Sequence, residues 1–184
     1  MRFLLRASLF LLVLGLFGAV VAGGGAIYGL WHYGRTLPDY KQLADYSPPT
    51  VTRVHAGDGR LIAEYAKERR VFVPVGAMPP LVIRAFIAAE DQNFYSHPGV
   101  DFIALARAVV TNIVNYTSGR RPVGASTITQ QVAKNFLLTN EVSFERKIKE
   151  AILAFRIERA LSKDRILELY LNEIYLGYGS YGVA

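Results

Sequence analysis

The chain has 184 residues, 52% of them apolar, so it can bury the core of one domain with a short appendage. It contains no cysteine, which excludes a disulfide framework, a thiolate nucleophile and a cysteine-ligated metal. The formal net charge is +6, and basic residues outnumber acidic ones between Lys134 and Arg165. Such a stretch is typical either of a solvated helix face or of a surface that binds phosphates, anionic lipids or nucleic acid.

An uncharged segment over residues 7–31 follows Arg2 and Arg6. About 20 apolar residues suffice for a helix to cross the hydrocarbon core of a bilayer. Because cytoplasmic flanks carry the positive charge, residues 1–33 are predicted to be a transmembrane signal-anchor of the inner (cytoplasmic) membrane, with the remaining chain on its outer face. A cleaved signal peptide, with an apolar region over 9–22, is the alternative. With the domain exported, no nucleic-acid partner is expected.

Residues 34–50 contain three prolines and are predicted to be an extended linker. A short β segment is expected over 51–78, because Gly57-Asp58-Gly59 separates two β-like runs, which is typical of a hairpin. The run "RRVFVPV" is interpreted as a further strand at an edge. From 79 to 184 the apolar spacing is helical, so the predicted fold class is mainly α.

Helix boundaries are predicted from capping residues and helix breakers. The expected helices are one from Pro79-Pro80 to about Ala89 or Asp91, one capped by Asp101 and ended by Thr117-Ser118-Gly119, one capped by Ser126 or Thr127, one from Ser143 to Leu161, and one capped by Ser162 and ended by Gly177.

The apolar run over 81–89 leads directly into Glu90 and Asp91. A carboxylate at the rim of a packed helix is partly desolvated, which suits a general base. Two structural alternatives stay open, because either acid could pair with an arginine or accept hydrogen bonds from backbone N–H groups. His97 precedes Pro98-Gly99 and is expected to pack within a loop; a lone histidine is also a poor metal site.

Two downstream helices carry polar patterns. Thr127, Gln131 and Lys134 follow helical spacing, and a stripe of hydroxyl, amide and ammonium suits phosphate or sugar hydroxyls, although it also fits an ordinary surface helix. Arg146 and Glu150 have the spacing of an intrahelical ion pair. The alternative is that Arg146 and its neighbour hold a phosphate while Glu150 faces the same cleft.

Four stretches resemble successive motifs of the peptidoglycan glycosyltransferase domain found in class A penicillin-binding proteins and in monofunctional transglycosylases. They are "EDQNFYSHPGVD" (90–101), "GASTITQQVAKNFLL" (124–138), "RKIKEAILAFRIE" (146–158) and "KDRILELYLNEIYLGYGSYGV" (163–183). Their order and spacing match as well, which makes the resemblance specific. The stretch over 51–80 is similar to the lead-in of the bifunctional 1A type.

The resemblance implies a lysozyme-like, mainly α domain over 79–184, incomplete at its carboxyl terminus because the chain ends at "GYGSYGVA" inside the last motif. It implies polymerisation of lipid II into β-1,4-linked glycan strands, with a lipid-linked glycan as donor, inversion at the anomeric carbon and release of undecaprenyl pyrophosphate. The membrane and cell-wall synthesis proteins are the other partners that it suggests. A penicillin-sensitive transpeptidase domain is expected beyond residue 184.

The resemblance also implies roles for individual residues. Glu90 matches the catalytic base, and Glu150 matches a second essential glutamate near the donor diphosphate, where a divalent cation (Mg²⁺ or Mn²⁺) is expected with the substrate. Lys134, Arg146 and Lys147 match residues that neutralise the diphosphate. The other matched positions are Thr127, Gln131 and Asn135, which bind substrate or diphosphate, and Asp91, Phe94, His97 and Ser126, which support the site.

Two alternatives compete with this interpretation. The first is a lysozyme-like enzyme that cleaves glycan, and the basic residues argue against it because a polymer-cleaving enzyme has no diphosphate to hold. The second is a catalytically silent, membrane-anchored scaffold for cell-wall synthesis proteins, and the intact glutamate pair argues against that.

Overall fold

The computed structural model describes residues 2–46, 52–65, 71–139 and 141–183. Contacts between Cα atoms divide the chain into two compact units, residues 1–37 and residues 38–184. The first unit consists of α1 (Arg2–Gly34), a single continuous helix. Its segment Phe10–Gly34 has 25 residues and a mean hydropathy of 2.3, and none of its apolar window is buried. Its length and composition therefore suit a membrane span. The predicted apolar helix is therefore present.

The second unit begins with the short 3-10 helix η1 (Lys41–Leu43) and a β-hairpin. Strands β1 (Thr52–His55) and β2 (Leu61–Tyr65) are antiparallel and form the predicted hairpin. Gly59 has a φ of +84°, which glycine adopts at no steric cost, and the turn is closed by the Asp58 carboxylate, which accepts from the Arg60 backbone N–H at 3.0 Å.

The predicted strand in "RRVFVPV" is wrong for its described residues 71–75, while residues 69 and 70 lie outside the described part of the chain. The side chain of Asn172 satisfies the backbone here instead of a neighbouring strand. Val73 N donates to Asn172 Oδ1 at 2.8 Å, and Asn172 Nδ2 donates back to Val73 O at 2.9 Å. The 3-10 helix η2 (Val75–Ala77) follows.

The rest of the unit is helical, as predicted, and its longer elements are α2 (Pro80–Glu90), α3 (Phe102–Thr117), α4 (Ile128–Leu137), α5 (Phe144–Ala160) and α6 (Lys163–Glu173). The predicted caps Asp101 and Ser162 each accept a hydrogen bond from the first turn of their helix, and Ser143, predicted only as the start of its helix, does the same. Of the two candidate caps of α4, Thr127 is the residue that caps it, and it forms a complete capping box with Gln130.

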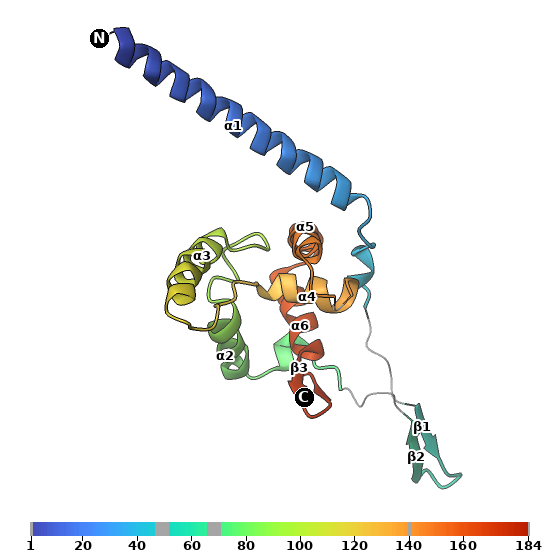
Figure 1. Ribbon diagram of the computed structural model, residues 1–184. Helices are drawn as coiled ribbons and strands as arrows, with labels where there is room; N and C mark the ends of the chain where they lie inside the picture. Colours follow the sequence, from blue (N-terminus) through green and yellow to red (C-terminus); the bar gives the residue numbers. More distant parts are fainter. Residues whose placement is uncertain (1, 47–51, 66–70, 140, 184) are drawn as a thin grey trace. The chain divides into compact units, whose positions relative to one another are not determined.

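The core of the second unit is centred on α4, which packs against both α5 and α6 (Figure 1). One face of each helix is fully buried, with Ile128 from α4, Leu153 from α5 and Leu167 from α6 at 0% exposure. Burying an aliphatic side chain of this size contributes about 1.5–3 kcal/mol, so this three-helix contact holds the domain together.

Two expectations about helices are corrected. The last helix ends at Glu173 rather than Gly177, because Tyr175–Gly177 (β3) pairs with Ser180–Tyr181 (β4) in a tight hairpin. The helix α2 was predicted to be packed, but none of its residues is buried. An unbroken apolar run does not show which face is covered, and here only one side of α2 faces the domain.

Candidate active site

A pocket of about 220 Å³ opens beside the carboxyl end of α2. It is lined by Ala88, Ala89, Glu90, Asp91, Gln92, Asn93, Asp101, Ala104, Arg107, Gly124, Ala125, Ser126 and Thr127. Glu90, the predicted base, is thus in a hollow large enough for part of a sugar ring. Its side chain is exposed, so the expected partial desolvation by a packed helix is wrong for this structure.

Gln131 holds the Glu90 carboxylate in place. Its Nε2 donates to Glu90 Oε2 at 2.8 Å and so joins the end of α2 to the middle of α4. A base is effective when its lone pair is aimed at the proton that it removes, and a fixed amide donor provides that aim.

Asp91, directly after Glu90, is turned the other way and is buried at 7% exposure. Its Oδ1 and Oδ2 lie 2.9 and 3.0 Å from His97 Nε2, and Oδ2 also accepts from the backbone N–H of Ile128 at 3.0 Å. The Gly99 N–H donates to His97 Nδ1 at 3.1 Å, which leaves that nitrogen unprotonated. His97 is therefore the neutral tautomer that donates its Nε2–H to Asp91.

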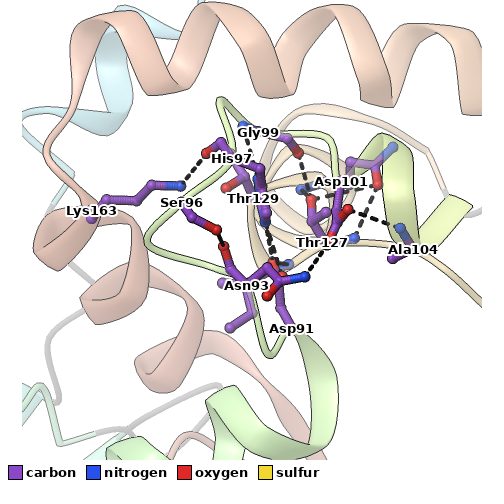
Figure 2. Close-up of polar contacts among 12 residues, drawn as sticks. Asp91, Asn93, Ser96, His97, Gly99, Asp101, Ala104, Thr127, Thr129 and Lys163 are labelled. Atoms are coloured by element: carbon purple, nitrogen blue, oxygen red, sulfur yellow. Dashed lines mark hydrogen bonds and ion pairs between the residues drawn. The ribbon is translucent and has the colours of Figure 1, made fainter.

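Of the two adjacent acids, Asp91 is the one with a structural role. Asp91 fixes the loop after α2 to the amino end of α4, and the helix dipole there favours a carboxylate. His97 fills the loop interior, as expected for a histidine before Pro98-Gly99. Figure 2 shows the Asp91–His97 pair with the surrounding polar contacts.

Thr127 makes internal hydrogen bonds rather than facing a ligand. Its hydroxyl donates to Gly99 O at 2.6 Å (Figure 2). The same hydroxyl accepts from Gln130 N at 3.2 Å. Only 2% of Thr127 is exposed, so its placement favours support of the pocket wall over direct substrate contact. Its predicted binding role stays a prediction.

Gly99 brings the loop against α5. Its φ is +102°, and a Cβ at this position would lie 2.8 Å from both the carbonyl carbon and the oxygen of Ala154. No side chain fits in this space. The close contact with α5 and the positive φ both require glycine at this position.

Asp101 closes the other end of the loop. Its Oδ1 accepts from the Ala104 N–H at 2.8 Å, and its Oδ2 accepts from Asn93 Nδ2 at 2.8 Å. The bond from the Ala104 backbone, followed by that from Asn93, lowers the pKa of the Asp101 carboxyl.

Lys163, at the start of α6, was not singled out from the sequence, yet it supports the same loop. Its Nζ donates to His97 O at 2.8 Å and to Glu158 Oε1 at 2.8 Å, and it lies 4.4 Å from the ring centroid of Phe94. Phe94 itself is 0% exposed. Phe94 is thus a buried anchor under a cation, and its predicted supporting role in the site stays a prediction.

The second predicted glutamate, Glu150, is 1% exposed and is flanked by two cations. Lys147 Nζ lies 2.6 Å from Glu150 Oε2, and Arg146 Nη1 lies 3.4 Å from Glu150 Oε1. Lys147 also donates to Ser126 Oγ at 3.0 Å, and Ser126 lines the pocket. We call Arg146, Lys147 and Glu150 the cationic cluster, since two positive charges flank one carboxylate.

The cationic cluster has features of both interpretations of this helix, an intrahelical ion pair and a group of cations that could hold a phosphate. The ion pair between Arg146 and Glu150 exists, and Lys147 reaches the pocket wall with 47% of its side chain exposed. No hydrogen bond or ion pair among the described residues joins Lys134 or Asn135 to the cluster, and Lys134 forms no ion pair there. Their predicted binding roles stay predictions.

The family resemblance implies a divalent cation near Glu150. The carboxylate of Glu150 is already neutralised by two cations, and within the described ranges no group of three or more histidine or acidic residues converges on one point. These residues do not form a cation site on their own, whereas a divalent cation bound together with a substrate diphosphate needs only one or two protein carboxylates.

In class, the second unit is a helical domain whose pocket has a carboxylate held by Gln131 on its rim and Ser126, which accepts a hydrogen bond from Lys147, in its wall, an arrangement that suits group transfer. Comparison with known families gives the same class. The Transglycosylase family model matches residues 58–184. The chain belongs to this family, whose lysozyme-like domain agrees with the mainly α fold found here.

Curated relatives extend the match into the amino-terminal part. Penicillin-binding protein 1A of Rickettsia conorii is 59% identical over 179 residues, which is 97% of this chain and 23% of the relative. Penicillin-binding protein 1A of Aquifex aeolicus is 48% identical over 94% of this chain and 23% of its own length, and that of Escherichia coli is 48% identical over 89% and 19%. The chain thus spans about a quarter or less of the relatives that it matches.

Proposed function

We propose that the chain is the glycan-polymerising part of a peptidoglycan glycosyltransferase that uses lipid II. The observation that carries the proposal is that one pocket has Glu90 on its rim and Ser126, hydrogen-bonded to Lys147, in its wall. The transfer needs both parts, a base for the acceptor hydroxyl and positive charge for the leaving diphosphate. Membership of the transglycosylase family supports the same reaction.

The proposed step is an inverting substitution. Glu90 accepts the proton of the 4-hydroxyl of lipid II as that oxygen forms a bond to the anomeric carbon of the lipid-linked glycan. The bond from that carbon to the diphosphate oxygen breaks, and undecaprenyl pyrophosphate leaves with the electron pair. The cationic cluster stabilises the charge that develops on the diphosphate, where preorganised charges have their largest effect. Lys134 is assigned to the same diphosphate.

Membrane attachment is part of the proposal. The apolar segment of α1 suits a span, and Arg2 and Arg6 before it favour a cytoplasmic amino terminus. On α3 the aliphatic residues Ile103, Val110 and Ile113 are each more than 60% exposed. An exposed apolar face of this kind suits a domain that works beside a lipid surface and takes a lipid-linked substrate.

For the whole protein, we propose a bifunctional enzyme of the inner membrane with a transpeptidase part outside the present chain. The relatives are named penicillin-binding proteins, which supports this assignment. Interaction with other cell-wall synthesis proteins and a divalent cation held with the substrate diphosphate near Glu150 stay predictions from the family resemblance.

Incubation of the protein with lipid II in vesicles tests the function. We expect glycan strands and released undecaprenyl pyrophosphate, resolved by gel electrophoresis and by chromatography. Release of soluble muropeptides from purified sacculi would instead indicate a glycan-cleaving enzyme. Absence of both products would leave the scaffold interpretation and contradict the proposal.

A further inference from the structure

Tyr170 in α6 is a buried polar residue that the proposed mechanism does not use. The residue is 1% exposed, and its hydroxyl makes no hydrogen bond with any residue that the structure describes. A buried hydroxyl without a partner destabilises a fold, so a tyrosine at a position where phenylalanine would pack equally well calls for a reason.

The packing places Tyr170 against Phe86, which lies one helical turn before Glu90 in α2. Its ring meets the ring of Phe86 edge-on, with centroids 6.1 Å apart and planes at 76°. Phe86 and Glu90 are four residues apart in α2 and therefore share one face of that helix. Tyr170 thus lies against the face of α2 that ends in the proposed base.

Electrostatics agree with this placement. Burial raises the pKa of the Tyr170 hydroxyl, and the negative charge of Glu90 raises it further. The hydroxyl is therefore within electrostatic reach of the carboxylate. In Glu90 itself, Oε2 is held by Gln131, while Oε1 has no hydrogen-bond partner among the described residues.

We propose that Tyr170 is a positioning residue for Glu90, and that its buried hydroxyl donates a hydrogen bond to Oε1 when that oxygen turns inward while Oε2 keeps its bond from Gln131. The inference rests on the proposed function, in which Glu90 is the base. Two donors, the Gln131 amide on one oxygen and the Tyr170 hydroxyl on the other, would fix the orientation of the carboxylate. A donor also favours the ionised form, which is the form that accepts a proton.

The variant Tyr170→Phe removes only the oxygen and keeps the ring against Phe86. We expect the turnover number for lipid II to fall about tenfold, with KM little changed, and the acidic limb of the pH–rate profile to move to higher pH. The melting temperature should stay the same or rise, because a buried hydroxyl without a partner is removed. The control Tyr116→Phe removes a hydroxyl from a residue that is 90% exposed on α3 and should change none of these values.

Two results would overturn the inference. One is a wild-type turnover number and pH profile in Tyr170→Phe. The other is a melting temperature that falls well below the wild-type value, since that would mean that the hydroxyl supports the fold through another partner.

A second measurement does not depend on activity. In protein labelled with ¹³C at tyrosine Cζ, the Tyr170 resonance should shift between about pH 3 and about pH 7, the range in which a carboxyl group titrates. The shift should be absent in Glu90→Gln. A resonance that is insensitive to pH in both proteins would overturn the inference. If the wild-type protein made no glycan, the proposed function would fail, whereas this titration would still decide whether Tyr170 contacts Glu90.

Discussion

The side-chain amide of Gln131 donates to Glu90 Oε2 at 2.8 Å across 41 positions of sequence. This bond connects the stretch over 90–101 to the stretch over 124–138. It also shows that Gln131, one of the polar residues spaced along α4, has a specific hydrogen-bond partner. The carboxylate and the amide form one unit, in which Gln131 orients the group that is proposed to take the proton.

Replacing Gln131 with leucine should slow polymerisation and leave the fold intact. A hydrogen bond to a charged group is worth about 1.5–3 kcal/mol, and each 1.36 kcal/mol of transition-state stabilisation changes a rate tenfold. We expect the turnover number to fall by roughly one to two orders of magnitude, measured with lipid II at saturation. The control Gln42→Leu changes an exposed glutamine far along the chain and should retain the rate. Equal rates for both variants would show that the amide does not orient the base.

Gly99 is predicted to be intolerant of any side chain. In Gly99→Ala the new Cβ would meet the Ala154 backbone at 2.8 Å in a conformation with φ of +102°. Crowding and backbone strain together should lower the free energy of unfolding by about 3 kcal/mol. Gly119→Ala is the matched control, because Gly119 has a φ of +64° and nothing within 4 Å of the added atom. It should cost only about 1–2 kcal/mol in chemical denaturation. A smaller loss in Gly99→Ala than in the control would refute the close contact with α5.

The sequence predicted local features well, because capping and turn chemistry depend on a few neighbouring residues. Asp101 and Ser162 cap helices as expected, one helix starts at Ser143 as expected, and Gly57-Asp58-Gly59 turns the hairpin. Cap residues are informative because their side chains replace specific missing hydrogen bonds of the first helical turn.

The predictions that failed, and the contacts that no prediction covered, concern segments distant in sequence. Nothing local indicates that the Asn172 side chain, 99 positions away, would take the place of a strand beside Val73. The support that Lys163 gives to His97 O likewise spans 66 positions. Burial of Glu150 and exposure of Glu90 also depend on which helix faces are covered, and an apolar pattern leaves this open for α2.

Lys147 should contribute to diphosphate binding more than its neighbour on the same helix. In Lys147→Met the ammonium at the pocket wall is lost, and the affinity for undecaprenyl pyrophosphate should fall about tenfold. Lys149→Met is the matched control, because Lys149 pairs with Glu145 at 2.6 Å, whereas Lys147 donates to Ser126, which lines the pocket. Calorimetric titration should give the wild-type affinity for this control. A tenfold loss in both variants would indicate a general effect of net charge rather than a site.

Acid should weaken the cap of α3. Because hydrogen bonds from Ala104 and Asn93 lower the pKa of Asp101 in the folded state, its carboxylate stabilises the fold above the unfolded value of about 3.9. That contribution is lost as the pH falls through the lowered folded value. In Asp101→Asn, which retains a capping oxygen, we expect lower stability than the wild type at neutral pH and a difference that shrinks below about pH 4. Denaturant unfolding at a series of pH values measures this. A difference that is independent of pH would show that the Asp101 charge does not contribute.

The central claim is that Glu90 is the base of a glycan-polymerising enzyme, and the variant Glu90→Gln tests it most directly. The substituted amide retains an oxygen for the Gln131 donor but does not take up the hydroxyl proton. In vesicles we expect this variant to bind lipid II with wild-type affinity and to make glycan strands at least about a hundredfold more slowly. The control Glu141→Gln, at an exposed loop residue, should polymerise normally. Glycan strands formed by Glu90→Gln at a rate near that of the wild type would contradict the account.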